Sequence, residues 1–302
     1  GEFPERAIRY CLESAGARLA DVDHVAFYWR PFHGLHRRAA QIARTLPGSL
    51  RYWDSHAGKW WSMVGTRREL RRRLSPPGAP RPGFRFHGVR HHLAHAASAF
   101  FASPFESAAF LTLDGSGEID SATIGAGEGT RLRTLREVRY PHSMGYLYVS
   151  LTHYLGFKPD SDEYKVMALA SYGESSRYYD GFRELVRLRP DGGYELDLRY
   201  FDYPMGKRDP WVSARFIERF GPPRRSGEPV GERHKLVAWA LQRRLEDVAL
   251  HMAREARRRT GLRRLVLAGG CALNSVMNER LRREGPFDEV WVPPAPNDAG
   301  AA

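Results

Sequence analysis

The sequence predicts an α/β protein, and three observations support this prediction. Its 302 residues are enough for one large or two closely packed α/β domains, and a composition of 42% hydrophobic and 27% charged residues is that of an ordinary folded protein. Residues 84–113 have the pattern strand, helix, strand, and residues 264–292 have the pattern strand, loop, helix, strand. Such alternation is typical of α/β folds, whose ligands bind in loops that follow strands.

The first third of the chain combines regular elements with an insertion. We expect an amphipathic helix over residues 4–17 and a strand over 24–29. Residues 34–83 mix helical patches with tryptophans and end in a Pro/Gly-rich loop, which indicates an irregular insertion.

The middle of the chain alternates between the two kinds of element. The pattern predicts a strand over residues 84–89, a helix over 91–101, an apolar strand over 108–113 and two strands within 122–140. Residues 145–172 look largely helical. We assign three glycines to turns: Gly125, Gly127 and Gly129.

The last part begins with a polar stretch, residues 174–229, which we expect to form a lid or a peripheral subdomain. A long helix over 232–259 follows. It leads into a strand over 264–267, a helix that ends near Leu281 and a strand over 289–292.

The charge and cysteine content limit the classes of protein that fit. The net charge of +12 would suit nucleic acid, a membrane surface or an anionic small molecule. The arginine runs lack interleaved aromatic residues, which favours solvated helix faces over a nucleic-acid site. Cys11 and Cys271 form neither a disulfide framework nor a CxxC motif, and no apolar run reaches membrane-spanning length. We expect a cytoplasmic protein with no membrane or nucleic-acid partner.

Two histidines stand four residues apart in the predicted helix. His91 and His95 would lie on one helical face and could chelate a single cation; the alternative is a pair of capping or solvent-exposed histidines. Metalloproteases of the HExxH type have a catalytic glutamate at the second position, where this chain has His92. That substitution argues against a protease.

Carboxylates follow two of the predicted strands. Asp114 ends an apolar strand, and Asp298 lies in a loop after the last one, so either could project into a cleft. An ordinary Asp-Gly turn is the alternative for Asp114. Together with the histidines they would form a two-His, two-carboxylate site, whose mixed ligands suit iron(II), manganese or zinc.

Glycines beside these carboxylates could admit a phosphate. Gly115 and Gly117 allow a sharp turn that presents backbone N–H groups to an anion. Gly269 and Gly270 separate a strand from a helix that begins near Asn274, where the helix dipole favours a nucleotide. Tight strand-to-helix packing is the alternative, because neither a Walker motif nor a complete GxGxxG is present.

Five segments together resemble the carbamoyltransferase family that includes the nodulation protein NodU and the cephalosporin and tobramycin carbamoyltransferases. They are HHLAHAASAF at 91–100, DGSGE at 114–118, KVMALASYG at 165–173, the segment 269–278 and NDAG at 297–300.

The resemblance implies an actin-like, hexokinase-type ATPase fold, with metal and nucleotide in the cleft between lobes that we place at 1–145 and 146–302. It puts His91, His95, Asp114 and Asp298 on the family's metal ligands, and we expect iron(II) before manganese or zinc. Gly115, Gly117, Gly269, Gly270 and Asn274 fall on segments that line the nucleotide site. Lys165 could contact phosphate or carbamoyl oxygen, and His92 either assists proton removal or packs the helix.

The resemblance also implies an ATP-dependent O-carbamoyltransferase. Its carbamoyladenylate, made from carbamoyl phosphate and ATP, would donate the carbamoyl group to a hydroxyl of a small molecule such as an antibiotic, a sugar or a nodulation factor. Family members begin with a strand hairpin and continue into a YrdC-like domain, so we expect this chain to be truncated at both ends. The alternatives are threonylcarbamoyl transfer to tRNA and a non-catalytic, actin-like nucleotide-binding protein.

Overall fold

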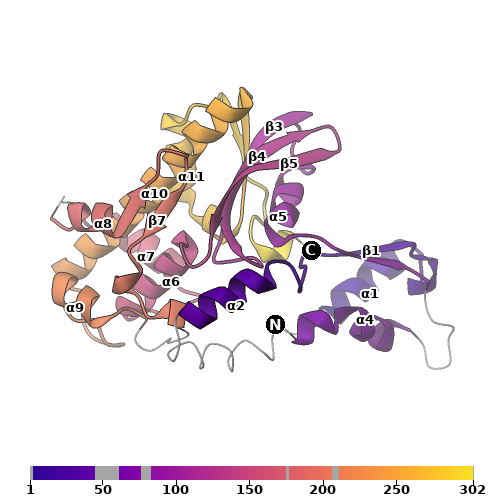
Figure 1. Cartoon of the computed structure of the whole chain (residues 1–302), viewed down its shortest axis with the longest axis horizontal. Coiled ribbons are helices and arrows are strands. Elements are labelled where there is room, and N and C mark those ends of the chain that lie inside the picture. Colours follow the sequence, from indigo (N-terminus) through magenta and orange to yellow (C-terminus); the bar gives the residue numbers. More distant parts are fainter. Residues whose placement is uncertain (1–2, 45–60, 76–82, 175–176, 206–210, 302) are drawn as a thin grey trace.

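A mixed five-stranded β-sheet forms the centre of the molecule (Figure 1). In sheet order its strands are β5 (Arg131–Arg139), β4 (Asp120–Glu128), β3 (Ser107–Leu113), β8 (Arg264–Ala268) and β9 (Glu289–Trp291). The computed structural model describes residues 3–44, 61–75, 83–174, 177–205 and 211–301. β3, β4 and β5 pair in antiparallel fashion, whereas β8 and β9 run parallel to β3. The carboxyl ends of β3, β8 and β9 therefore meet at one edge of the sheet.

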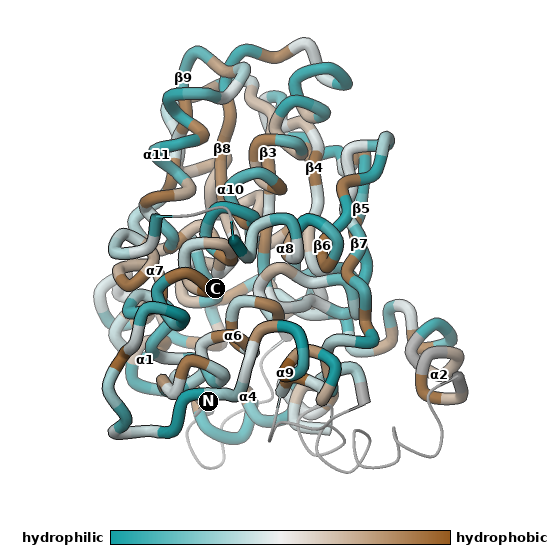
Figure 2. The backbone as a smooth tube through the Cα atoms, turned by 90° about the vertical axis from the view of Figure 1, so that its left-hand side faces the viewer, coloured by the Kyte–Doolittle hydropathy of each residue, from teal (hydrophilic) through white to brown (hydrophobic). Residues whose placement is uncertain are grey.

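Helices cover both faces of this sheet, which confirms the predicted α/β class. Helix α5 (His91–Phe100) packs against β3 and β8 on one face, and the long helix α10 (Glu232–Thr260) packs against β3 and β4 on the other. The side chains of β3 alternate between the two sides. Those of Ala109, Leu111 and Leu113 belong to the hydrophobic cluster around α10, whereas Ala108 and Phe110 pack with α5. Figure 2 shows hydrophobic residues along β3 and β8 inside the molecule.

The prediction that residues 174–229 form a lid or a peripheral subdomain is wrong, because described residues of this stretch contribute to the main core. Phe182, Tyr194 and Phe216 are at most 2% exposed and join the cluster around α10. The prediction rested on the polar composition of the stretch as a whole, and this average does not reveal the few aromatic residues that are buried. The elements on this side of the molecule are α6 (Met144–Tyr154), α7 (Glu163–Ala170), α8 (Tyr179–Leu185), β6 (Val186–Leu188), β7 (Tyr194–Leu196), the 3-10 turns Leu198–Tyr200 and Tyr203–Met205, α9 (Ala214–Phe220) and α11 (Ser275–Glu284).

Several elements of the N-terminal region form a smaller unit beside the sheet (Figure 1). They are α1 (Glu5–Ser14), a 3-10 turn (Leu19–Asp21), β1 (His24–Phe27), α4 (Thr66–Leu74) and β2 (Arg85–Gly88). Helix α2 (Leu35–Arg44) comes from the same region of the chain but lies apart from α1 and α4. β1 and β2 pair in parallel, and a separate cluster of Leu19, Leu70, Leu74 and Phe84 packs beneath them. Parts of the predicted insertion, residues 45–60 and 76–82, lie outside the described residues.

The other predicted elements are present within a few residues of their expected bounds, and the division into lobes at residue 145 stays a prediction. None of the helices in the described ranges is long and apolar enough to cross a membrane.

Two of the three glycines assigned to turns lie inside a strand instead. Gly125 and Gly127 belong to β4, and only Gly129 is in the turn that follows it. A Cβ on Gly125 would lie 2.2 Å from the Phe110 ring and 2.3 Å from the Arg133 carbonyl oxygen. The glycine is therefore needed for close packing rather than for turning.

We predict that Gly125→Ala destabilises the protein by at least about 1–3 kcal/mol, because the buried strand leaves no space for a methyl group. Gly83→Ala is the matched control, since a Cβ there meets nothing within 4 Å. Urea unfolding monitored by circular dichroism measures both. Equal midpoints for the two variants would contradict the packing described here.

Candidate metal centre

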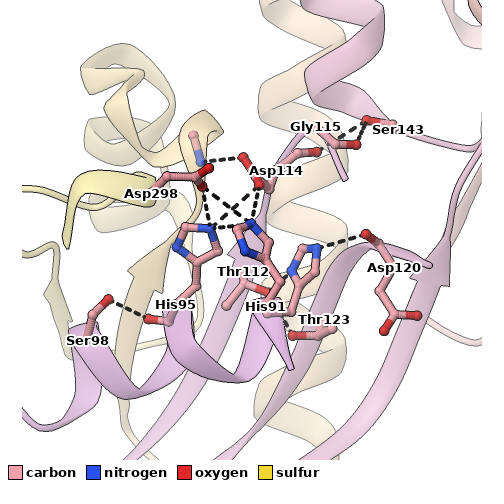
Figure 3. Close-up of polar contacts among 12 residues, drawn as sticks. His91, His95, Ser98, Thr112, Asp114, Gly115, Asp120, Thr123, Ser143 and Asp298 are labelled. Carbon is pink, nitrogen blue, oxygen red and sulfur yellow. Dashed lines mark hydrogen bonds and ion pairs between the residues drawn. The ribbon is translucent and has the colours of Figure 1, made fainter. Parts of the chain in front are cut away.

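Four side chains from three distant parts of the chain converge at the carboxyl edge of the sheet (Figure 3). His91 and His95 come from the first turns of α5, Asp114 follows β3 directly, and Asp298 begins the 3-10 turn Asp298–Gly300 beyond β9. One ligand atom from each lies within 4.8 Å of all the others. The structure thus brings together the four residues that the sequence suggested as metal ligands.

The distances between these atoms fit a shared cation. The Nε2 atom of His91 lies 3.0 Å from Asp114 Oδ2, 3.1 Å from His95 Nε2 and 3.3 Å from Asp298 Oδ1. His95 Nε2 lies 3.5 Å from Asp114 Oδ2 and 3.2 Å from Asp298 Oδ1. With metal–ligand bonds of about 2.1 Å, ligands at right angles or tetrahedral angles are separated by about 3.0–3.4 Å. Two carboxylates would also neutralise a divalent charge.

The charges of the cluster compensate one another strongly. Burial by itself would lower the pKa of His91, but its contacts with Asp114 and Asp298 outweigh burial and raise the pKa to about 10. The same carboxylates raise the pKa of His95 against the effect of burial. Burial opposes ionisation of Asp114, yet the two imidazoles hold its pKa well below the usual range. Without a metal, protons on the imidazoles therefore balance the carboxylates.

The exposure of the cluster is uneven. The side chains of His91 and His95 are at most 1% exposed, whereas that of Asp298 is 61% exposed. The Nδ1 atoms of both histidines are buried and have no hydrogen-bond partner among the described residues. The cluster therefore opens to solvent on the side of Asp298.

Asp114 is held by backbone groups on both sides. Its Oδ1 atom accepts a hydrogen bond of 2.9 Å from the N–H of Gly270, which leaves Oδ2 directed at the histidines. The Ser143 hydroxyl donates to the Gly115 carbonyl at 2.6 Å and lies 3.2 Å from the Asp114 carbonyl oxygen, and a Cβ on Gly145 would lie 2.8 Å from the Asp114 carbonyl oxygen. The start of α6 is therefore packed directly against the end of β3. These contacts join residues more than 25 positions apart, so no local pattern indicated them.

Glu118 is a further residue of the centre that the sequence did not single out, although it belongs to the DGSGE segment. Arg90, which precedes α5, provides no side-chain cap. Glu118 supplies one instead, because both of its carboxylate oxygens lie 3.2 Å from the N–H of His91. A negative charge at a helix N-terminus is also favourable. Glu118 therefore fixes the first turn of the helix that carries both histidines.

Most of the glycines expected to bind nucleotide form backbone hydrogen bonds within the protein. Gly270 donates to Asp114, and Gly117 donates to the Asp120 carbonyl at 2.7 Å. Gly269 has a φ of +91° and donates to the Pro296 carbonyl. A Cβ on Gly115 would make only ordinary contacts, with the Tyr146 ring. A role of these glycines in nucleotide binding stays a prediction.

Asn274 also has structural partners. Its side chain accepts from the N–H of Met277 as the N-cap of α11, and it exchanges two hydrogen bonds with Gln242 of α10. The residue is only 9% exposed. Its expected place beside a nucleotide is likewise still a prediction.

His92 faces away from the four-residue cluster and is 3% exposed. Its Nε2 atom must carry the proton, because it lies 3.0 Å from a carbonyl oxygen, that of Asp120. Nδ1 then accepts from the Thr112 hydroxyl at 2.7 Å, and Thr123 donates to Thr112. Burial lowers the pKa of His92 to about 3. With both ring nitrogens engaged, this geometry favours the packing role over that of a base.

Lys165 lies on α7, and its recorded contacts are local. Its ammonium group is 3.0 Å from Asp162 and sits over the ring of Tyr164. The side chain is 43% exposed. None of these contacts reaches the four-residue cluster, so the expected contact with phosphate or carbamoyl oxygen stays a prediction.

Comparisons with known proteins show the family of this chain. The family model described as "Carbamoyltransferase N-terminus" matches residues 1–302. An uncharacterized protein of Synechocystis is 39% identical over 307 residues, which cover 99% of this chain and 49% of that protein. Nodulation protein NolNO of Sinorhizobium fredii is 34% identical in a match of 309 aligned positions, which covers 100% of this chain and 41% of NolNO. Among solved structures, HypF of T. kodakarensis aligns with 72% of this chain and 35% of its own, at 14% identity and a TM-score of 0.36.

The chain thus spans about half the length of the curated relatives it matches. A shorter stretch of 42 residues is 60% identical to nodulation protein U of Bradyrhizobium diazoefficiens. Because the family model covers the whole chain and two relatives exceed 30% identity along it, the resemblance is confirmed, and this chain belongs to the carbamoyltransferase family of the NodU type.

Proposed function

We propose that this region performs the carbamoyl-transfer step of an ATP-dependent O-carbamoyltransferase, at a divalent metal held by His91, His95, Asp114 and Asp298. One observation carries the proposal. In a member of a carbamoyltransferase family, two imidazoles and two carboxylates from three distant segments meet at the edge of the sheet where α/β proteins bind ligands. A bound metal would act there as a Lewis acid toward a carbamoyl oxygen.

The residues of the chain have distinct tasks in this proposal. His91 and His95 contribute neutral donor atoms from a rigid, buried helix, and Asp114 contributes negative charge fixed by the N–H of Gly270. Asp298 contributes the second charge from the solvent-exposed side. Substrate would therefore approach past Asp298, because the opposite side is closed by α5 and the sheet. Mixed nitrogen and oxygen donors suit iron(II), with manganese and zinc as the alternatives.

The donor in this proposal is carbamoyladenylate, formed from carbamoyl phosphate and ATP, and the acceptor is a hydroxyl of a small molecule. Gly115, Gly117, Gly269, Gly270 and Asn274 are the proposed neighbours of the nucleotide, in the cleft of an actin-like fold. The loops after β3 and β8 carry these glycines beside Asp114, which supports a nucleotide close to the metal. The whole protein's activity, cytoplasmic location and substrates are parts of the same proposal.

The test of the function supplies the full-length protein with iron(II), carbamoyl phosphate, ATP and a panel of hydroxylated metabolites. We expect pyrophosphate release together with a carbamoyl mass increment on at least one acceptor. A parallel reaction contains unmodified tRNA, threonine, bicarbonate and ATP. Modified adenosine in that reaction would replace our proposal with threonylcarbamoyl transfer, and nucleotide binding without either product would indicate a non-catalytic protein.

We predict that Asp298→Ala weakens iron(II) or cobalt(II) binding at least about 100-fold, since it removes one of four ligands. The variant should still fold, because the side chain is 61% exposed, but the loss of its charge should lower the pKa of His91. Asp288→Ala is the control, as that carboxylate is 51% exposed and pairs only with the surface residue Arg263 among its recorded contacts. Metal content by elemental analysis and thermal unfolding decide the outcome. Full metal occupancy in Asp298→Ala would refute the ligand assignment.

We also predict that metal affinity rises with pH. The pKa of His91 is raised to about 10 without metal, and that of His95 is raised as well, so a metal must displace protons below that pH. Between about pH 6 and pH 8 the affinity should rise about tenfold per pH unit for each proton displaced. Calorimetric titration in buffers of different ionisation enthalpy counts these protons. A pH-independent affinity with no proton release would contradict the cluster's charge balance.

A further inference from the structure

The segment that follows β1 lies against the proposed metal centre, although it belongs to the smaller N-terminal unit. The ring centroid of Trp29 is 5.1 Å from that of His91, and the ring of Tyr28 is 5.8 Å from it. Both aromatic residues are partly buried. Both rings therefore lie against the imidazole of His91.

The charge of the cluster acts on Tyr28 as well. Burial and, after it, the negative charge of Asp298 raise the pKa of Tyr28. The phenol thus stays protonated at neutral pH.

One buried carboxylate ties this aromatic segment to the helix that carries the histidines. Glu118 Oε1 accepts a hydrogen bond of 2.7 Å from the N–H of Arg30, and the same group accepts from the N–H of His91. Glu118 is only 3% exposed. Gly88 completes the arrangement, because its carbonyl accepts from Arg30 Nε and a Cβ on it would lie 3.0 Å from the Trp29 carbonyl oxygen.

We infer that Tyr28 and Trp29 form an aromatic wall of the metal centre and that Glu118 is a positioning residue, which holds this wall and the ligand His91 in one fixed relation. The inference rests on the metal site of the proposed function. It makes the N-terminal unit part of the site, since the wall limits the access of water to His91 and leaves the side of Asp298 open. A fixed aromatic ring this close to a ligand should also respond to metal binding.

The test of the wall uses cobalt(II), which quenches the fluorescence of nearby tryptophans. The chain has seven tryptophans, so the contribution of Trp29 is isolated by difference. We expect cobalt(II) to quench part of the emission of the unmodified protein and of the control Trp239→Phe. Trp239 belongs to α10, and its indole packs against Tyr179 of α8. Trp29→Phe should bind cobalt(II), as measured by calorimetry, but lose most of this quenching.

The outcomes distinguish a failure of the aromatic wall from a failure of the proposed metal site. Quenching in Trp29→Phe equal to that of the unmodified protein would overturn the wall and leave the metal site intact. Failure of the unmodified protein to bind cobalt(II), iron(II), manganese or zinc would overturn both.

The test of Glu118 is the substitution Glu118→Gln, which keeps the size but offers one neutral acceptor oxygen to two N–H groups and turns an amide N–H₂ toward them. We expect cobalt(II) affinity to fall about 10- to 100-fold, as is typical when the support of a ligand is lost. The quenching at saturating cobalt(II) should also fall, because Trp29 is no longer held beside His91. A merely structural role would lower thermal stability without changing that saturating amplitude.

The control for this substitution is Glu128→Gln, at the exposed end of β4. Affinity and saturating amplitude in Glu118→Gln equal to those of the control would overturn the positioning role. If Glu118→Gln does not fold, Glu118→Asp replaces it, since the shorter carboxylate keeps the charge but cannot reach both N–H groups. The same two measurements then decide.

Discussion

The burial of β3 on both of its faces is the constraint on which the rest of the structure depends. Helix α5 covers one face of β3 and α10 covers the other. A polar residue can therefore follow this strand only beyond the two helices that cover it. The next residue, Asp114, therefore emerges at the carboxyl edge of the sheet, beside the first turns of α5. Because β8 and β9 run parallel to β3, the loops that follow them reach the same edge. The position of the four-residue cluster follows from this packing.

Glycines let the main chain pack closely around the four-residue cluster. Gly269 turns with a φ of +91°, and a Cβ there would lie 2.2 Å from the Leu113 carbonyl oxygen. Only glycine allows β8 to end this close to the end of β3. Gly145 plays the same part for α6, and Gly117 for α5, where a Cβ would lie 3.0 Å from that of His91. The close approach of the main chain at these three glycines thus places the four side chains of the cluster within reach of one another.

Hydrogen bonds fix the orientation of the side chains in the cluster. Gly270 fixes one oxygen of Asp114, Glu118 fixes the start of α5, and His92 joins that helix to β3 through Thr112. Each contact satisfies a polar group that would otherwise be buried without a partner. Together they hold the ligands through backbone and side-chain partners that lie outside the cluster. Such support is what allows a metal site to keep its geometry during a reaction.

The sequence by itself determined most of the elements and pointed to the four residues that we propose as metal ligands. Apolar periodicity gave α5, β3, α10 and β8 nearly to the residue, and the spacing of His91 and His95 placed both on one helical face, because these features depend only on neighbours within a few positions. It failed for Gly125 and for residues 174–229, where contacts with distant residues decide burial.

Only the tertiary structure decided what surrounds the ligands. The order β3-β8-β9 brings Asp298 to Asp114 across 184 positions of the chain, and the pairing of Glu118 with Arg30 attaches the N-terminal unit to His91. It also showed that both ring nitrogens of His92, which the sequence left open as a base or a packing residue, form hydrogen bonds inside the protein. The physical reason is that burial and hydrogen-bond geometry are properties of the packed chain, set by residues that no local pattern connects.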